Sequence, residues 1–208
     1  MELKIKKYFT SLILLFSVIS LYAKPLRYKG YPTSIQINNK NSFYLMINND
    51  YDFSFYTINV NNGLLESNPI NNLKKSDLQN NINDFISAYE KEAIKDNFLQ
   101  KIIQNELKKE EIKINHNNNV VITLYVSYTF YKKIDDKIYC IFNFEDGNYI
   151  YPSQLLYFEN SNWKCRKLSK ENIIYFSELG NNQFICIKYN LKKDMTTVIL
   201  LDDIKKLK

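Results

Sequence analysis

The sequence predicts an α+β fold in which one antiparallel meander sheet packs on one long helix, after an N-terminal set of short strands. Three patterns predict it: side chains alternate between apolar and polar over residues 34–60, a helical period follows Ser76, and alternation returns after Val120. The chain has 208 residues, of which 45% are hydrophobic, so it can form one ordinary core. The expected organisation is a signal peptide over residues 1–23 and a single α+β domain over 24–208.

The signal peptide is predicted from the order of charge and hydropathy at the N-terminus. Three lysines lie among the first seven residues, and an uncharged run from Tyr8 to Ala23 follows. This order is typical of secretory signals, and the run is shorter than the roughly 20 residues that a membrane-spanning helix needs. Cleavage after Ala23, cleavage after Ser20 and a retained anchor all stay open. We therefore expect a periplasmic or secreted bacterial protein.

The charge of the chain restricts its partners. Removal of residues 1–23 takes away three lysines and one glutamate and lowers the formal charge from +6 to +4. An exported basic protein is expected to meet a protein partner, an anionic envelope polymer or a small apolar ligand, and not nucleic acid. Contact with a membrane is expected only through the N-terminal segment, if it is retained.

The β-rich N-terminal part, residues 24–75, is expected to hold three short strands. They lie around Ile35 and Ile37, over 43–47 and over 53–57, with turns between them. A loop is predicted from Asn61 to Lys75.

The helix is expected over residues 76–110, with Ser76 as its N-cap. Its apolar positions recur at intervals of three and four, with a phase slip near Asp96 and Asn97. The slip predicts either one curved helix or two helices with a bend. The opposite face is polar, so we expect the helix to lie on a sheet.

Residues 111–208 are expected to form the antiparallel sheet. In residues 120–130 and 138–144 the even positions are mostly apolar and the odd positions mostly polar, so the even face is predicted to be buried and the odd face wet. A three-residue loop at Ile134–Asp136 would pair Phe130 with Cys140. The remaining predictions are strands over 149–158, 163–168, 184–189 and 196–201, and a short helix over 169–179. This order of strands, helix and curved meander resembles the layout of cystatin-like and nuclear-transport-factor-like folds.

The reactive residues do not form a recognisable active site in the sequence. Cys140 and Cys165 are predicted to lie about 9.5 Å apart across the sheet and about 13 Å apart along it, too far for a disulfide, which needs Cα atoms within about 7 Å. We expect buried free thiols there and at Cys186 rather than a bridge. The only histidine, His116, is expected to be exposed in a loop, and the pairs Asp135–Asp136 and Glu145–Asp146 to be turn residues. No metal ligands, cofactor or catalytic residues are predicted, so an enzyme is the third hypothesis.

The best candidate binding residues are three tyrosines. Tyr125, Tyr131 and Tyr139 fall on the predicted polar face of the meander, where tyrosine offers rigid, amphipathic contact area. The leading hypothesis is an exported, non-enzymatic binding protein of a bacterial envelope that recognises a protein through this sheet face, as an inhibitor or immunity protein would. The alternative is a periplasmic protein that holds an apolar or sugar ligand between helix and curved sheet.

Overall fold

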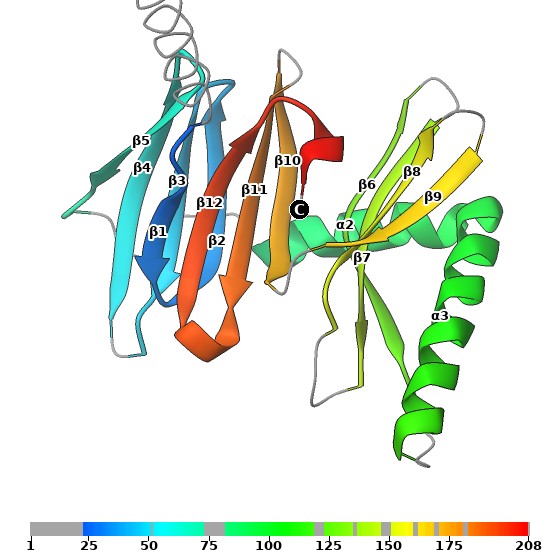
Figure 1. The fold of residues 1–208 in the computed structure, drawn as a ribbon. Coiled ribbons are helices and arrows are strands. Elements are labelled where there is room, and N and C mark those ends of the chain that lie inside the picture. The colour runs from blue at the N-terminus through cyan, green and yellow to red at the C-terminus, as the bar shows by residue number, and fades with distance from the viewer. Residues whose placement is uncertain are drawn as a thin grey trace, which may run out of the picture.

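The computed structural model describes most of the chain after the expected signal segment. The described residues are 23–50, 52–72, 82–118, 123–134, 137–146, 151–159, 162–168, 171–180 and 183–207. They form three four-stranded antiparallel sheets and two α-helices, and strands predominate (Figure 1). The prediction of a single sheet packed on one long helix is therefore wrong.

The first sheet, called the outer sheet, is a local meander. Its strands are β2 (Tyr31–Asn39), β3 (Ser42–Asn48), β4 (Phe53–Asn61) and β5 (Leu64–Pro69), in that order. The three strands expected from the alternation of apolar residues are confirmed, whereas β5 replaces the first part of the predicted loop. Each strand pairs with the next along the chain.

The second sheet, called the central sheet, joins the two ends of the described chain. Its order is β1-β12-β11-β10, with β1 (Leu26–Lys29), β12 (Met195–Leu201), β11 (Gln183–Asn190) and β10 (Asn172–Gly180). The register places Leu26 opposite Val198, so the strand after the expected signal pairs with the last strand of the chain. The helix predicted over 169–179 is wrong, because this segment is mostly β10.

The third sheet, called the helix-covered sheet, is the sheet on which the two helices pack. Its strands are β6 (Tyr125–Ile134), β7 (Lys137–Glu145), β8 (Gln154–Glu159) and β9 (Asn162–Lys167), in that order. The helices α2 (Ile82–Lys95) and α3 (Asn97–Asn118) pack on one face of it (Figure 1). Of the two expected forms, one curved helix or two helices with a bend, the structure has the second. The Asp96 Oδ1 accepts hydrogen bonds from the backbone N–H groups of Phe98 and Leu99 at the start of α3.

Three apolar clusters hold the layers together. The first lies between the outer and central sheets, the second between the central and helix-covered sheets, and the third between the helix-covered sheet and the two helices. The central and helix-covered sheets are thus buried on both faces over much of their length. Such strands carry continuous apolar runs instead of a clean alternation, which is why the expectation of a wet odd face is wrong.

A β-bulge in β6 changes which residues share a face. Tyr128 lies opposite Phe142, but Phe130 lies opposite Ile141, so Thr129 is the additional residue. Beyond the bulge, Tyr131 pairs with Cys140, and the predicted pairing of Phe130 with Cys140 is wrong by one residue. A shift of one residue moves each later side chain to the other face of the sheet.

A buried polar seam links the helix-covered sheet to the central sheet at this bulge. The Thr129 hydroxyl donates to the Ile173 carbonyl at 3.1 Å, and the Asn143 amide donates to the Thr129 oxygen at 3.2 Å. The Ser153 hydroxyl donates to the Asn143 carbonyl oxygen and accepts from the Ile173 N–H. All three side chains are buried, and each has a hydrogen-bond partner, so burying them costs little. The hydrogen bonds to Ile173 hold the two sheets in a defined relative position.

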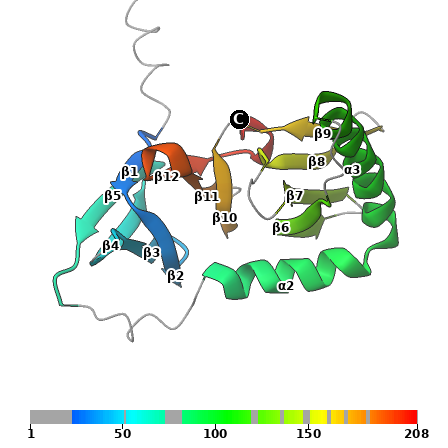
Figure 2. The same cartoon turned by 90° about the horizontal axis from the view of Figure 1, so that it is seen from below.

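The helix α2 runs along the edges of all three sheets. It contacts β2, β10 and β6, which are the edge strands of the outer, central and helix-covered sheets, and Figure 2 shows it crossing beneath them. Exposed edge strands are templates for unwanted pairing, so one helix protects three edges. Within the described ranges, neither helix is both long and apolar enough to cross a membrane.

Candidate functional site

The structure does not bring the three predicted tyrosines together. Tyr131 faces the helices, where its hydroxyl donates to the Asp96 Oδ2 at 2.9 Å, and Tyr139 packs on the cluster between the central and helix-covered sheets. Burial and the hydrogen bond to Asp96 raise the pKa of Tyr131 to about 12, so its hydroxyl stays protonated and engaged. Tyr125, in contrast, is 65% exposed at the first residue of β6.

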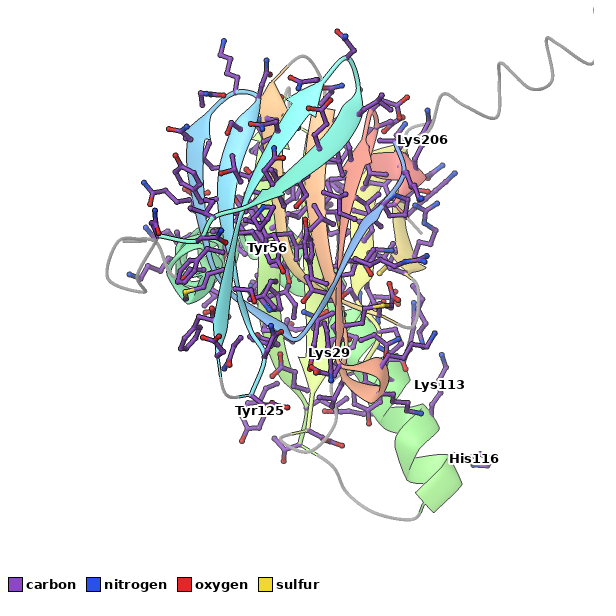
Figure 3. All side chains as sticks on the ribbon, turned by 90° about the vertical axis from the view of Figure 1, so that its left-hand side faces the viewer. Lys29, Tyr56, Lys113, His116, Tyr125 and Lys206 are labelled. Carbon is purple, nitrogen blue, oxygen red and sulfur yellow. The ribbon has the colours of Figure 1, made fainter. Side chains whose placement is uncertain are left out.

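Tyr125 belongs to an end of the molecule where other large side chains are exposed. This end, called the tyrosine end, consists of Tyr31, Tyr125, Tyr189 and Leu191. Figure 3 shows Tyr125 near the lower end of the sheets, with Lys29 above it. Tyr31 is placed near Tyr125 by Glu145, which lies opposite Tyr125 in β7 and raises the pKa of Tyr31. In Figure 1 the short 3₁₀ helix η2 (Leu191–Lys193) lies at the same lower end, between β11 and β12.

A glycine corner places Tyr31 in this surface. Gly30 joins β1 to β2 with φ +103°, and a Cβ at this position would collide with the Asn48 carbonyl oxygen and the Asn49 side-chain oxygen. The Gly30 N–H donates to the Asp194 carbonyl at 2.9 Å, and the Thr196 hydroxyl donates to the Gly30 carbonyl at 2.5 Å. The corner is thereby fixed to the turn between β11 and β12.

Tyr31 and Tyr189 meet across this corner as two perpendicular rings. Their centroids are 4.9 Å apart and their planes are inclined by 85°. Tyr189 also donates a hydrogen bond to the Asp194 Oδ1 at 2.9 Å, and burial together with this bond raises its pKa to about 12. Burial, and then the charge of Glu145, raise the pKa of Tyr31. Both phenols are therefore neutral at physiological pH.

Glu145 connects Tyr125 to the pair of rings. It lies opposite Tyr125 in the register of β6 and β7, accepts a hydrogen bond from the Ser127 hydroxyl at 2.5 Å, and is near enough to Tyr31 to affect its pKa. Asp50 acts on Tyr189 in the same way. The tyrosine end thus combines aromatic rings with carboxylates, an arrangement that can receive a lysine or arginine side chain through cation–π and ionic contacts.

Asp50 and Asp194 both adopt the left-handed conformation, with φ of 62° and 46°. Aspartate tolerates this region better than most residues, because its short polar side chain bonds locally. The Asp194 carboxylate accepts such a local bond from the hydroxyl of Tyr189, five residues earlier in the chain. The turn that carries Asp194 is consequently held in a defined shape.

The cysteines are free thiols in the described structure, as expected. Cys140 and Cys165 both lie opposite Leu156, so one strand separates them, without the predicted offset along the sheet. Two strand spacings amount to about 9.5 Å, which is still too far for a disulfide. Burial raises the pKa of Cys186 and of Cys165 to about 12 and that of Cys140 well above its usual value, so the three stay protonated.

The other reactive residues are dispersed. His116 is exposed in the last turn of α3, so the prediction that it lies in a loop is wrong. Figure 3 shows it near the end of this helix, well apart from Tyr125. Glu145 is the last residue of β7, so its prediction as a turn residue is wrong. Asp146 follows the strand, and Asp135 and Asp136 lie outside the described residues. Among the described residues no group of three or more histidine, cysteine, aspartate or glutamate side chains is placed to hold a metal ion.

Sequence reasoning missed Tyr31, Tyr189 and Leu191. No local pattern joins Tyr31 to Tyr189, because their contact depends on the pairing of β1 with β12. The available signal was Gly30, a glycine between two short alternating segments, which indicates a tight corner.

Comparison with protein-family models, with curated proteins and with solved structures found no match for this chain.

Proposed function

We propose that this chain is an exported, non-enzymatic binding protein of a bacterial envelope and that it recognises a protein partner through the tyrosine end. One observation carries the proposal: Tyr31, Tyr125 and Leu191 are 40%, 65% and 75% exposed. Tyr31 contacts Tyr189, which is two residues before Leu191, and Glu145 lies opposite Tyr125 and acts on Tyr31. Tyrosine is enriched at the energetic centres of protein interfaces, because it buries a large rigid area and keeps a hydrogen-bonding hydroxyl.

The charges around the rings favour a basic segment in the partner. The charge of Glu145 acts on Tyr31, and the charges of Asp194 and Asp50 act on Tyr189, although the chain as a whole carries a formal charge of +6. A lysine or arginine inserted against the two rings would gain cation–π and ionic contacts that the rest of this basic surface does not offer.

The packing between the helices and their sheet supports this hypothesis over the ligand-cavity alternative. Leu99, Ile103, Phe142 and Phe144 fill that space and are almost wholly buried. A ligand between helix and sheet would have to displace these side chains. A protein-binding surface at the tyrosine end requires no such rearrangement.

The test is affinity capture with a matched set of surface variants. The wild-type protein is expected to enrich one defined protein from the envelope fraction of its source cells, identified by mass spectrometry. The variant Tyr31→Ser/Tyr125→Ser/Leu191→Ser is expected to lose it, because truncation of a central aromatic residue costs about 2 kcal/mol or more. The control Leu64→Ser/Ile94→Ser changes side chains that are 48% and 62% exposed elsewhere. Equal capture by both variants would remove the assignment.

The export part of the proposal has a separate test. The mass of the protein recovered from the cell envelope or medium is expected to lack residues 1–23, or 1–20 if cleavage follows Ser20. Recovery of the full-length protein from the cytoplasm alone would contradict export.

A further inference from the structure

A groove on the central sheet, beside the tyrosine end, has the composition of a ligand site. It has a volume of about 470 Å³, which lies in the range of about 300–1,000 Å³ usual for small-molecule sites. Its lining consists of Pro25, Arg27, Glu171, Lys193, Met195, Thr197 and Ile199.

The position of the groove follows from the way the layers diverge. Arg27 lies opposite Thr197 in the register of β1 and β12, so both are on the face that points away from the outer sheet. The helix-covered sheet packs against the β10 side of this face, whereas β1 and β12 extend beyond it (Figure 2). Thr197 is buried, and Met195 and Ile199 are half-buried beside it. The base of the groove is therefore formed by the apolar side chains of Met195 and Ile199 and by Thr197.

The charges at the groove are positive on balance. Its lining holds two cations, Arg27 and Lys193, and one acid, Glu171. In the described part of the chain, the side chains of Arg27, Lys193 and Glu171 make no hydrogen bond or ion pair. The donors of Arg27 and Lys193 are thus available to a ligand.

Arginine at this place is informative because the chain has only two arginines among 28 basic residues. The other one, Arg166, donates to the carbonyls of Lys205 and Leu207 and holds the C-terminal segment. A guanidinium binds carboxylate or phosphate with two parallel hydrogen bonds, which the ammonium of lysine cannot do.

We propose that this groove binds a small anion, a carboxylate or a phosphate ester, that carries a short apolar chain. The anionic group lies between Arg27 and Lys193, and the chain lies on Met195 and Ile199. This site shares the 3₁₀ helix η2 with the tyrosine end, since Lys193 and Leu191 both belong to it. The expected ligand is a small molecule and not a protein, so the two proposals can fail separately.

The experiment is a titration followed by amide chemical shifts of the isotope-labelled protein. The probes are octanoate and octyl phosphate, with octanol and octylamine as uncharged and cationic controls of equal chain length. Octanoate or octyl phosphate is expected to shift amides in residues 25–27 and 193–199 and to bind at least tenfold more tightly than octanol. The arm that binds more tightly identifies the anionic group.

Variants assign the charge. Arg27→Gln and Lys193→Gln are each expected to weaken binding of the anionic probe about threefold to tenfold, which corresponds to a charge-assisted hydrogen bond at a partly exposed site. Lys192→Gln is the control, because Lys192 precedes Lys193 in the same 3₁₀ turn and does not line the groove. The proposal would be overturned if octanol bound as tightly as the anionic probes, or if octylamine bound more tightly than they do. It would also be overturned if the amide shifts lay outside the groove, or if all three variants changed the affinity equally.

Discussion

Replacement of Gly30 by alanine tests how the corner holds the tyrosine end. Two costs add at this position. The backbone φ of +103° is sparsely populated for residues with a side chain, which costs about 1–3 kcal/mol, and the methyl group would collide with the oxygens of Asn48 and Asn49, which costs about 1–3 kcal/mol more. The expected loss in the free energy of unfolding is therefore about 4 kcal/mol. For a chain of this length it corresponds to a fall in Tm of roughly 8–16 °C.

Gly63 supplies the matched control. It also has a positive φ, +76°, but the nearest atom to an added Cβ is the Gln183 Nε2 at 4.0 Å, so only the conformational cost applies. Gly63→Ala is expected to lower the free energy of unfolding by about 1–2 kcal/mol. Urea unfolding of the two variants, followed by circular dichroism, measures the difference. Equal losses would refute the claim that contact with Asn48 and Asn49 fixes the Gly30 corner.

Asp96→Ala is expected to lower the free energy of unfolding by about 2–3 kcal/mol, because it removes both the cap of α3 and the acceptor of the Tyr131 hydroxyl. Tyr131→Phe removes only the second bond and should lower it by about 1 kcal/mol in the same urea assay. Equal losses would show that the cap contributes nothing. Burial alone would raise the pKa of Glu110, but hydrogen bonds from Lys167 and Lys113 outweigh it and lower the pKa below 4.5. This carboxylate therefore stabilises the fold above about pH 4.5, and its contribution is lost as the pH falls through the lowered pKa. The Tm measured from pH 6 to pH 3 should consequently fall more steeply for the wild type than for Glu110→Gln. Ser153→Ala should lower the free energy of unfolding by about 1–3 kcal/mol, because it leaves the buried Ile173 N–H without its acceptor, and a loss below about 0.5 kcal/mol would contradict the role of the polar seam.

Local patterns of the sequence predicted the local features of the fold. The strands of the outer sheet follow from the alternation of apolar residues, and the bend at Asp96 follows from the slip in the helical period. Both depend only on residues a few positions apart, where side-chain periodicity is informative. The α+β arrangement with a single sheet was wrong because pairing between distant strands, such as β1 with β12, leaves no trace in local periodicity.

Burial on both faces accounts for the other errors. The segment that forms β10 has apolar residues in an almost continuous run, Ile173 to Phe176, and such a run fits a strand or a buried helix equally well. The bulge at Thr129 shifts the register of β6 by one residue and thereby puts Tyr131 on the face toward the helices, away from the face that carries Tyr125 and Tyr139. Thr129 carries no special conformational signal in the sequence, and its role depends on the Ile173 carbonyl of another sheet.

Hydrogen exchange with the captured partner is the most direct test of binding through the tyrosine end. Mass spectrometry of peptides, recorded with and without the partner, is expected to show slower exchange in residues 29–33, 124–128 and 187–195, the segments that carry Tyr31, Tyr125, Tyr189 and Leu191. The edge strand β5 and the helix α3 are expected to exchange at unchanged rates. Slower exchange confined to β5 or α3, with the tyrosine end unaffected, would contradict the account.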